Sequence, residues 1–230
     1  MDETVGPGRL TDAWLGRLGA LVADAPVNLV SRGDRVDVRR RHLNECVAVA
    51  DLLQLRTGAR WMDLGTGGGL PGLVLAGAFP AVSWVLIDAR AKKIAQVARF
   101  AAELGLDNVR AQHARAEELG NDDEAFGAYD GVISRAVGSL SQTVALARPF
   151  ITSGEILAIR GSDAVAEAGA LGSVASDLGV AVASVHPVES AARATWLVRV
   201  QGCGPVPRTF PIVRDRLLRP NRGGLRDGSA

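Results

Sequence analysis

The fold is decided by the stretch Asp63-Leu64-Gly65-Thr66-Gly67-Gly68-Gly69-Leu70-Pro71-Gly72, which joins a short apolar run to a helical one. The run from Trp61 to Leu64 predicts a strand, and the run from Leu70 to Ala78 predicts a helix. The glycines therefore form the turn between them. So many glycines in one turn are costly for folding unless a ligand needs the backbone to come close. The stretch predicts a ligand-binding loop at the end of a strand.

Two cofactor motifs fit this loop. Gly67-x-Gly69-x-x-Gly72 is a dinucleotide fingerprint, and Asp88 at the end of the next strand could bind a ribose hydroxyl. Asp63-x-Gly65-x-Gly67-x-Gly69 is the first motif of S-adenosylmethionine enzymes. An acid directly before the turn would face the negative pyrophosphate of NAD, whereas it can support the ammonium group of a methionine. Asp63 therefore favours S-adenosylmethionine, and an NAD-dependent oxidoreductase remains the alternative.

The same reasoning gives further contacts to the cofactor. Asp88 suits the ribose hydroxyls under either motif, and Leu70 can cover the adenosyl group. The run Arg115-Ala116-Glu117-Glu118 follows the third expected strand, where a backbone amide at Ala116 or Glu117 could bind adenine. Taken alone, that run is also typical of an ordinary helix start, where acids suit the helix dipole.

Short apolar runs alternate with helical patterns from residue 60 onward. The expected strands are 61–64, 82–87, 108–112, 129–134 and 156–159, and the expected helices are 70–78, 91–104, 140–147 and 164–178. Such alternation predicts an α/β fold, with a parallel sheet covered by helices on both faces. The runs 180–185 and 195–200 predict an antiparallel hairpin at the far edge. A Rossmann-like sheet of seven strands closed by a hairpin is the architecture of class I methyltransferases.

The two ends of the chain differ from this middle part. Helical patterns at 10–24 and 38–55 predict an amino-terminal helical cap over residues 1–57, followed by a cofactor-binding methyltransferase domain over 58–202. Residues 203–230 are rich in proline and arginine and predict a basic, flexible tail. Five arginines and two aspartates at 32–41 give a net charge of +3, and the tail carries a net +4. Both segments could grip RNA phosphates, or could simply be solvated.

Composition limits the class of protein. With 230 residues, 47% of them hydrophobic, and a net charge of +1, the chain is expected to be globular and is no polyanion binder by bulk charge. The two cysteines form neither a disulfide framework nor a metal site. No signal peptide is evident, and glycines and prolines interrupt the uncharged stretch 64–87. We therefore expect a cytoplasmic protein without a membrane span or a metal.

Seven runs of the chain recur in order in one known family: Asn28-Leu29, Arg41-His42-Leu43, the glycine stretch, Leu86-Ile87-Asp88, Arg115-Ala116-Glu117-Glu118, Ser134-Arg135-Ala136 with Ser139-Leu140, and Arg160-Gly161. Over about residues 28 to 161 the chain resembles the glucose-inhibited division protein B family. Members of that family methylate guanine N7 in small-subunit ribosomal RNA. The resemblance implies that the cofactor is S-adenosylmethionine. It also implies that the partner is small-subunit ribosomal RNA within the ribosomal particle.

Residue roles follow from the resemblance, position by position. It implies that Gly65, Leu70, Ala116, Glu117 and Arg135 contact the cofactor or line its pocket, and that Asn28, Arg115 and Arg135 lie by the guanine and its phosphates. Arg160 stands where the family usually has lysine, and Thr195-Trp196 stand where it has arginine and histidine. These departures leave open a divergent member that acts on a small molecule.

The residue types also suit N7 chemistry. Methylation of cytosine C5 needs a thiolate, yet Cys46 precedes the cofactor domain and Cys203 follows its last strand. Guanine N7 is a lone-pair nucleophile without a proton to remove, so it needs only proximity and alignment. The base becomes cationic on methylation, so we assign Arg115 and Arg135 to anchoring and no residue to proton transfer. His42, Asn28 and Arg41 are expected at the rim.

Overall fold

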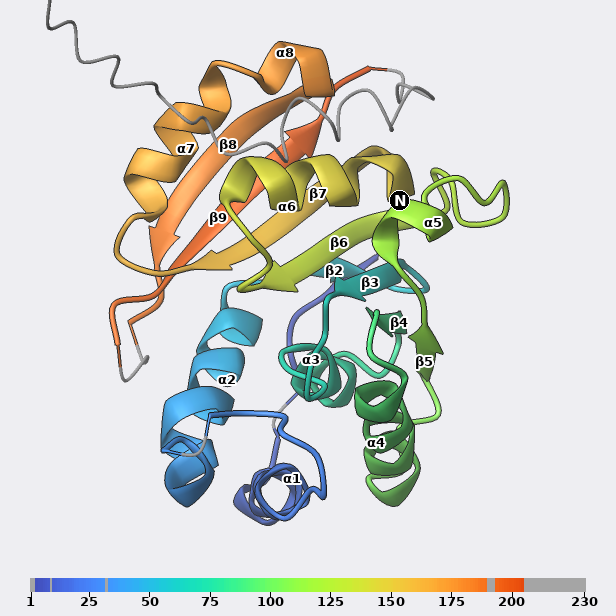
Figure 1. Cartoon of the computed structure of the whole chain (residues 1–230), viewed down its shortest axis with the longest axis vertical. Helices are drawn as coiled ribbons and strands as arrows, with labels where there is room; N and C mark the ends of the chain where they lie inside the picture. Colours follow the sequence, from blue (N-terminus) through green and yellow to red (C-terminus); the bar gives the residue numbers. More distant parts are fainter. Residues whose placement is uncertain (1–2, 9, 32, 190–192, 205–230) are drawn as a thin grey trace, which may run out of the picture.

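A computed structural model describes residues 3–8, 10–31, 33–189 and 193–204. Its centre is a seven-stranded sheet in the order β5-β4-β3-β6-β7-β9-β8 (Figure 1). The strands are β3 (Arg60–Leu64), β4 (Ser83–Asp88), β5 (Val109–His113), β6 (Tyr129–Arg135), β7 (Ile151–Arg160), β8 (Val180–Pro187) and β9 (Trp196–Gly202). Strands β3 to β7 are parallel, while β9 runs antiparallel to β7 and β8. This confirms the predicted class I methyltransferase fold.

The order of the strands positions the site. The chain moves from β3 outward through β4 to β5, then returns to place β6 on the other side of β3. Such a switch point leaves a crevice at the carboxyl ends of the two central strands. Asp63, next to the last residue of β3, and Arg135, at the end of β6, therefore lie at the same edge of the sheet.

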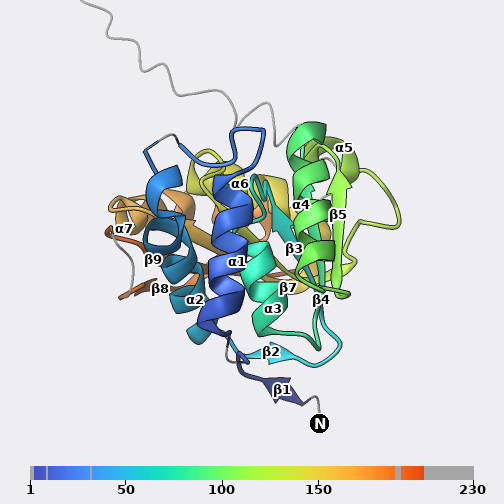
Figure 2. The same cartoon turned by 90° about the horizontal axis from the view of Figure 1, so that it is seen from below.

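One face of the sheet is covered by the amino-terminal half of the chain (Figures 1 and 2). Its helices are α1 (Asp12–Ala23), α2 (Asn44–Asp51), α3 (Gly72–Ala78) and α4 (Ala91–Glu103). A 3₁₀ turn, η1 (Arg35–Asp37), and a π-helical turn, η2 (Arg39–Leu43), lead into α2. Leu18 and Leu43 of this layer share one buried cluster with Trp84 and Leu86 of the sheet. The helices before residue 58 thus contribute to the core of the sheet.

The other face is covered by the carboxyl-terminal half (Figure 1). Its helices are α5 (Ala116–Leu119), α6 (Leu140–Ala147), α7 (Ala164–Gly172) and α8 (Ala175–Leu178), with a 3₁₀ turn, η3 (Arg148–Phe150). Ser139 begins α6 with a reciprocal capping box to Gln142, which fixes the turn after β6. Arg148 is 2% exposed, and its hydrogen bonds within the described residues go only to backbone carbonyl oxygens, at Leu178, Gly179, Ile151 and Gly204.

Three local features differ from the sequence-based expectation. A two-stranded sheet pairs β1 (Thr4–Val5) with β2 (Leu55–Arg56), outside the central sheet. The helix expected at 164–178 is interrupted after Gly172. Strand β7 begins at residue 151, five residues earlier than expected, because Gly154 lets the backbone of β6 approach at Asp130. No helix in the described part of the chain combines the length and the apolar character needed to cross a membrane.

Candidate functional site

Three glycines of the loop after β3 adopt left-handed backbone conformations. Their φ angles are +73° at Gly65, +58° at Gly67 and +87° at Gly69. A Cβ atom at Gly65 would lie 2.5 Å from Cγ2 of Val137, and one at Gly69 would collide with the side chain of Leu73. Packing alone therefore requires glycine at these two positions.

Gly67 differs from its neighbours in what surrounds it. The nearest atoms to a Cβ built at Gly67 are Nζ of Lys93, at 3.8 Å, and the carbonyl oxygen of Gly65, at 3.9 Å. Protein atoms therefore leave this face of the loop open. It is the point where a ligand can approach the backbone, with the ammonium group of Lys93 at its edge.

Asp63 lies beneath this loop and is completely buried. Its Oδ2 accepts hydrogen bonds from Oγ1 of Thr66, at 2.6 Å, and from the backbone N–H of Gly72, at 2.9 Å. Its Oδ1 is buried and has no partner among the described residues. Burial raises the pKa of Asp63 to about 6, although the two hydrogen bonds oppose this. An orphaned buried acceptor fits a cationic ligand group such as an ammonium.

Asp88, at the end of β4, binds the glycine loop directly. Its Oδ2 accepts from the backbone N–H of Gly67, at 3.0 Å, and its Oδ1 accepts from that of Arg90, at 2.8 Å. The side chain is half-buried. A carboxylate has about four lone-pair sites, so Asp88 retains acceptor capacity for a hydroxyl pair.

The start of α5 lies beside the end of β4. The backbone N–H of Ala114 donates to the carbonyl of Asp88, at 3.2 Å, which brings Ala116 and Glu117 to the same edge of the sheet. Both are half-buried, while Arg115 is exposed. Leu70 is 3% exposed and belongs to the buried cluster. The fold thus gathers every cofactor residue predicted from the sequence at the carboxyl ends of β3, β4, β5 and β6.

The amino-terminal segment reaches the same edge. A Cβ at Gly68 would lie 3.0 Å from Cβ of Leu29, so the loop that carries Asn28 lies against the glycine loop. Asn28 is exposed, and its Oδ1 accepts from Nη2 of Arg35, at 3.1 Å. The structure therefore places Asn28 beside the predicted cofactor loop, although the two are far apart in sequence.

Arg135 has an internal anchor that sequence reasoning missed. Its Nη1 donates to Oε1 of Glu45, at 3.1 Å, and lies 3.4 Å from Nδ1 of His42. Glu45 is only 4% exposed. Burial, and secondly the charge of Arg135, lower the pKa of His42, so its ring is neutral at pH 7. Nothing in the sequence pairs Glu45 with Arg135.

A cavity of 250 Å³ opens beside this anchor. It is lined by His42, Glu45, Arg135, Ala136, Ile159, Arg160, Gly161, Arg193, Ala194 and Thr195. Arg160 donates to both carboxylate oxygens of Glu167, at 2.7 Å each, and to the carbonyl of Gly138, at 2.8 Å. The planar guanidinium therefore holds the turn after β6, a task that the single ammonium of a lysine would do less completely.

In the cluster at 32–41, each arginine that the structure describes contacts another residue of the chain. The partners are the Val27 carbonyl and Asn28 for Arg35, Asp12 for Arg39, Asp37 for Arg40, and Asp34 for Arg41. Ion pairs on a surface contribute little stability, so a phosphate can compete for these side chains. Arg32 and the tail arginines, from residue 208 on, lie outside the described residues.

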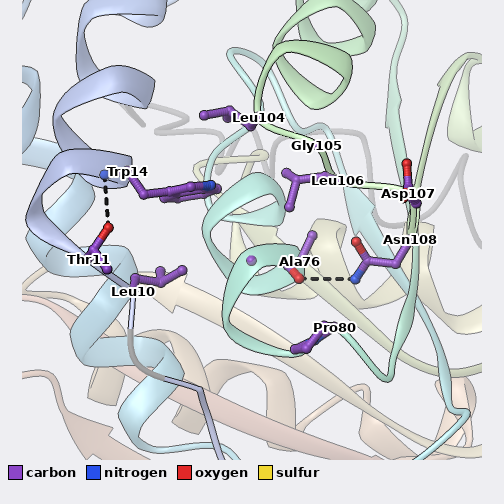
Figure 3. A pocket seen from close by; sticks show the side chains of 11 residues that line it. Leu10, Thr11, Trp14, Ala76, Pro80, Leu104, Gly105, Leu106, Asp107 and Asn108 are labelled. Atoms are coloured by element: carbon purple, nitrogen blue, oxygen red, sulfur yellow. Dashed lines mark hydrogen bonds between the residues drawn. The ribbon is translucent and has the colours of Figure 1, made fainter.

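Larger cavities lie elsewhere. One of 650 Å³ sits at the opposite end of the strands, between α1, α3 and the end of α4, where Trp14, Leu106 and Asn108 line it (Figure 3). It contains none of the residues predicted for catalysis or cofactor binding. Within the described residues, no three His, Cys, Asp or Glu side chains gather in a way that could hold a metal ion.

Comparisons with known proteins agree with this geometry. The solved structure of a SAM dependent methyltransferase from Aquifex aeolicus aligns with a TM-score of 0.55 at 14% identity, covering 84% of this chain and 99% of that one. At that identity the likeness establishes the fold only. 

Sequence relatives are more specific. A protein of Sorangium cellulosum named ribosomal RNA small subunit methyltransferase G is 42% identical over 156 residues, which cover 67% of this chain and 64% of the relative. Proteins with the same name from Porphyromonas gingivalis and Chlorobaculum tepidum are 39% and 37% identical, over 56% and 70% of this chain and 55% and 69% of their own lengths. The chain thus spans less than two thirds of the first two relatives.

The family described as rRNA small subunit methyltransferase G matches residues 20–195. This match includes the glycine loop, Asp88, the start of α5, and Arg135 with its anchor. Because it covers well over half of the chain, the protein belongs to the rRNA small subunit methyltransferase G family.

Proposed function

We propose that this protein transfers a methyl group from S-adenosylmethionine to N7 of a guanine in small-subunit ribosomal RNA. The observation that carries the proposal is the pairing of an open loop face at Gly67 with the orphaned Oδ1 of Asp63 beneath the same loop. A buried carboxylate oxygen without a donor fits the ammonium of a methionine and opposes a pyrophosphate. The names of the relatives supply the class of RNA.

Each cofactor residue contacts a different part of S-adenosylmethionine. Gly65, Gly67 and Gly69 let the backbone approach it, and Asp63 accepts from its ammonium group. Asp88 accepts from the ribose hydroxyls, Leu70 covers the adenosyl group, and the amides at Ala116 and Glu117 bind adenine. When bound, S-adenosylmethionine supplies a methyl carbon that is electrophilic because it is attached to a sulfonium.

The acceptor residues orient the base. Guanine N7 presents a lone pair, so no residue has to remove a proton. Methyl transfer is accelerated by aligning N7 with the methyl group of the cofactor. Arg115 and Arg135 hold phosphate or carbonyl oxygens and stay off the N7 edge, because a positive group there would oppose the cation that forms. Asn28, beside the glycine loop, borders the entry for the base. We assign the small subunit within the ribosomal particle as the substrate and the cytoplasm as its location.

Ligand binding and RNA analysis test this function in two steps. Adenosylhomocysteine should raise the melting temperature and NAD should not, because a ligand that binds only the folded state stabilises it. Purified small subunits incubated with the protein and S-adenosylmethionine should then gain one methyl group on a guanine, located by mass mapping of the RNA. Stabilisation by NAD alone would favour the oxidoreductase. Cofactor binding without RNA methylation would favour a small-molecule acceptor.

A further inference from the structure

Arg135 is held by one end of its guanidinium group. Nη1 carries two N–H groups, and both have acceptors nearby: Oε1 of Glu45, at 3.1 Å, and Nδ1 of His42, at 3.4 Å. Among the residues that the structure describes, Nε and Nη2 of Arg135 make no hydrogen bond. The group is thus fixed at one nitrogen and leaves a two-donor edge without a partner.

The anchor itself is fixed from three sides. Glu45 lies in the first turn of α2, and its Oε2 accepts from Oγ1 of Thr195, at 3.1 Å, next to the start of β9. His42 precedes Glu45 by three residues, and both side chains contact Nη1 of Arg135. Nε2 of His42 lies 3.4 Å from Oδ2 of Asp34. The carboxylate therefore joins the amino-terminal helices to β6 and β9 at the edge of the 250 Å³ cavity.

We propose that Glu45 is a positioning residue, which fixes the plane of Arg135 so that its Nε and Nη2 edge meets a phosphate of the acceptor nucleotide in this cavity. A two-donor guanidinium edge matches an oxyanion in bidentate geometry. The same edge cannot take the O6 and N7 pair of the target guanine, because N7 must stay free for methylation. This inference rests on the proposed function and adds to it the residue that sets the direction of Arg135.

A second ion pair in the same sheet shows what a purely structural pair looks like. Glu155 of β7 accepts from Nη1 of Arg199, at 2.8 Å, while Nη2 of Arg199 donates to the carbonyl of Leu52. Both ends of that guanidinium are thus occupied. The pair belongs to the amino-terminal half of β7, away from the cavity lining. Glu155→Gln is therefore a control that also removes the charge of a glutamate paired with an arginine, at a more exposed position than Glu45→Gln.

The first test compares these two variants in single-turnover methylation of small subunits at saturating cofactor. Glu45→Gln keeps the size of the side chain but removes its charge, and should slow methyl transfer by about tenfold or more. At a temperature at which both variants are folded, both should bind adenosylhomocysteine with wild-type affinity, and Glu155→Gln should keep the wild-type rate. A wild-type rate in Glu45→Gln, or a slowing shared by both variants, would overturn the proposal.

The second test separates positioning from stability. Millimolar guanidinium ion should partly restore methyl transfer to Arg135→Ala, because Glu45 can hold the free ion in place of the side chain. In Arg135→Ala combined with Glu45→Gln, the ion should restore nothing. Equal restoration in both variants would refute a positioning role for Glu45.

A milder variant covers the case in which the alanine variants do not fold. Thr195→Val removes one donor to Glu45 and leaves the contact with Arg135, so it should slow transfer by severalfold while raising the KM for the small subunit. An unchanged rate and KM would count against the proposal. If the wild-type protein binds adenosylhomocysteine but methylates no RNA, the proposed function fails. That result differs from the outcomes that would overturn the positioning role of Glu45.

Discussion

The two ends of the parallel strands differ in how their polar side chains are used. At the amino end, beside the 650 Å³ cavity, the amide nitrogen of Asn108 lies within hydrogen-bond distance of three carbonyl oxygens, at 3.0 to 3.2 Å. Asp130 there accepts from the side chain of Arg56 and the backbone of Arg60. At the carboxyl end, Oδ1 of Asp63 and one edge of Arg135 have no partner among the described residues.

The difference teaches that a cavity's size does not identify the site. Buried polar groups are normally satisfied, so charged groups that stay unpaired mark a place where a ligand completes the structure. Trp84, at the start of β4, does leave a buried indole N–H without a partner among the described residues, but that donor is neutral. We therefore expect changes at the carboxyl end to alter binding and rate, and changes at the amino end to alter stability.

The largest contrast should come from two glycines with the same backbone conformation. Gly67 has a φ of +58° and Gly105, after α4, has a φ of +68°, and neither would crowd a Cβ. Valine at either position is strained to a similar degree. Gly67→Val should weaken cofactor binding by about 3 kcal/mol or more, since its side chain enters the ligand space, whereas Gly105→Val should leave it unchanged. Calorimetry with adenosylhomocysteine measures both, and equal affinities would remove the loop from the site.

Asp88→Ala should have the next largest effect. The change removes a carboxylate that holds the backbone of Gly67 and is proposed to accept from the ribose, so affinity for adenosylhomocysteine should fall by roughly 1 to 3 kcal/mol. Binding calorimetry measures this loss. An unchanged affinity together with a slower turnover would contradict the ribose assignment.

Asn108→Ala tests the amino end in the same way. It withdraws the donor from three carbonyl groups, so the free energy of unfolding should fall by about 1 to 2 kcal/mol. Urea unfolding measures that loss, and affinity for adenosylhomocysteine should stay at the wild-type value. A loss of affinity without a loss of stability would break the contrast between the two ends.

A further contrast concerns pH. Folding raises the pKa of Asp63 from 3.8 to about 6, so the folded state binds this proton more tightly and the protein loses stability as pH rises between those values. Asp63→Asn removes the titration. The stability of the variant relative to wild type should therefore increase from pH 4 to pH 7, as followed by urea unfolding at several pH values. A constant difference would mean that Asp63 titrates alike in both states.

Much of the fold could be predicted because its signals are local. The glycine stretch, the acid at the end of β4 and the alternation of strands and helices are each contained in short windows of sequence. The hairpin of β8 and β9 followed from two apolar runs with a loop between them. Strands of two residues, such as β1 and β2, carry no pattern, and Thr152-Ser153-Gly154 conceal the first half of β7 because their residue types favour turns.

The site was less predictable because its contacts are distant in sequence. Arg135 was predicted as a site residue, but the carboxylate that holds it was not, since no periodicity links α2 to the end of β6. Charge counting likewise left open whether the arginines at 32–41 bind RNA or are solvated, while the structure gives those at 35–41 a partner inside the chain. Lys93, beside the open face of Gly67, could have been noticed as one of only two lysines.

The anchor of Arg135 has a consequence for the time at which the protein becomes active during its synthesis. Glu45 precedes Arg135 by 90 residues and His42 precedes it by 93. Translation proceeds from the amino end, so the two anchoring side chains emerge early and remain without their partner until the fourth parallel strand has been made. The glycine loop and Asp88 lie only 21 residues apart and can meet sooner. A nascent chain should therefore acquire its cofactor loop first and its acceptor site only when the amino-terminal helices close against the completed strand.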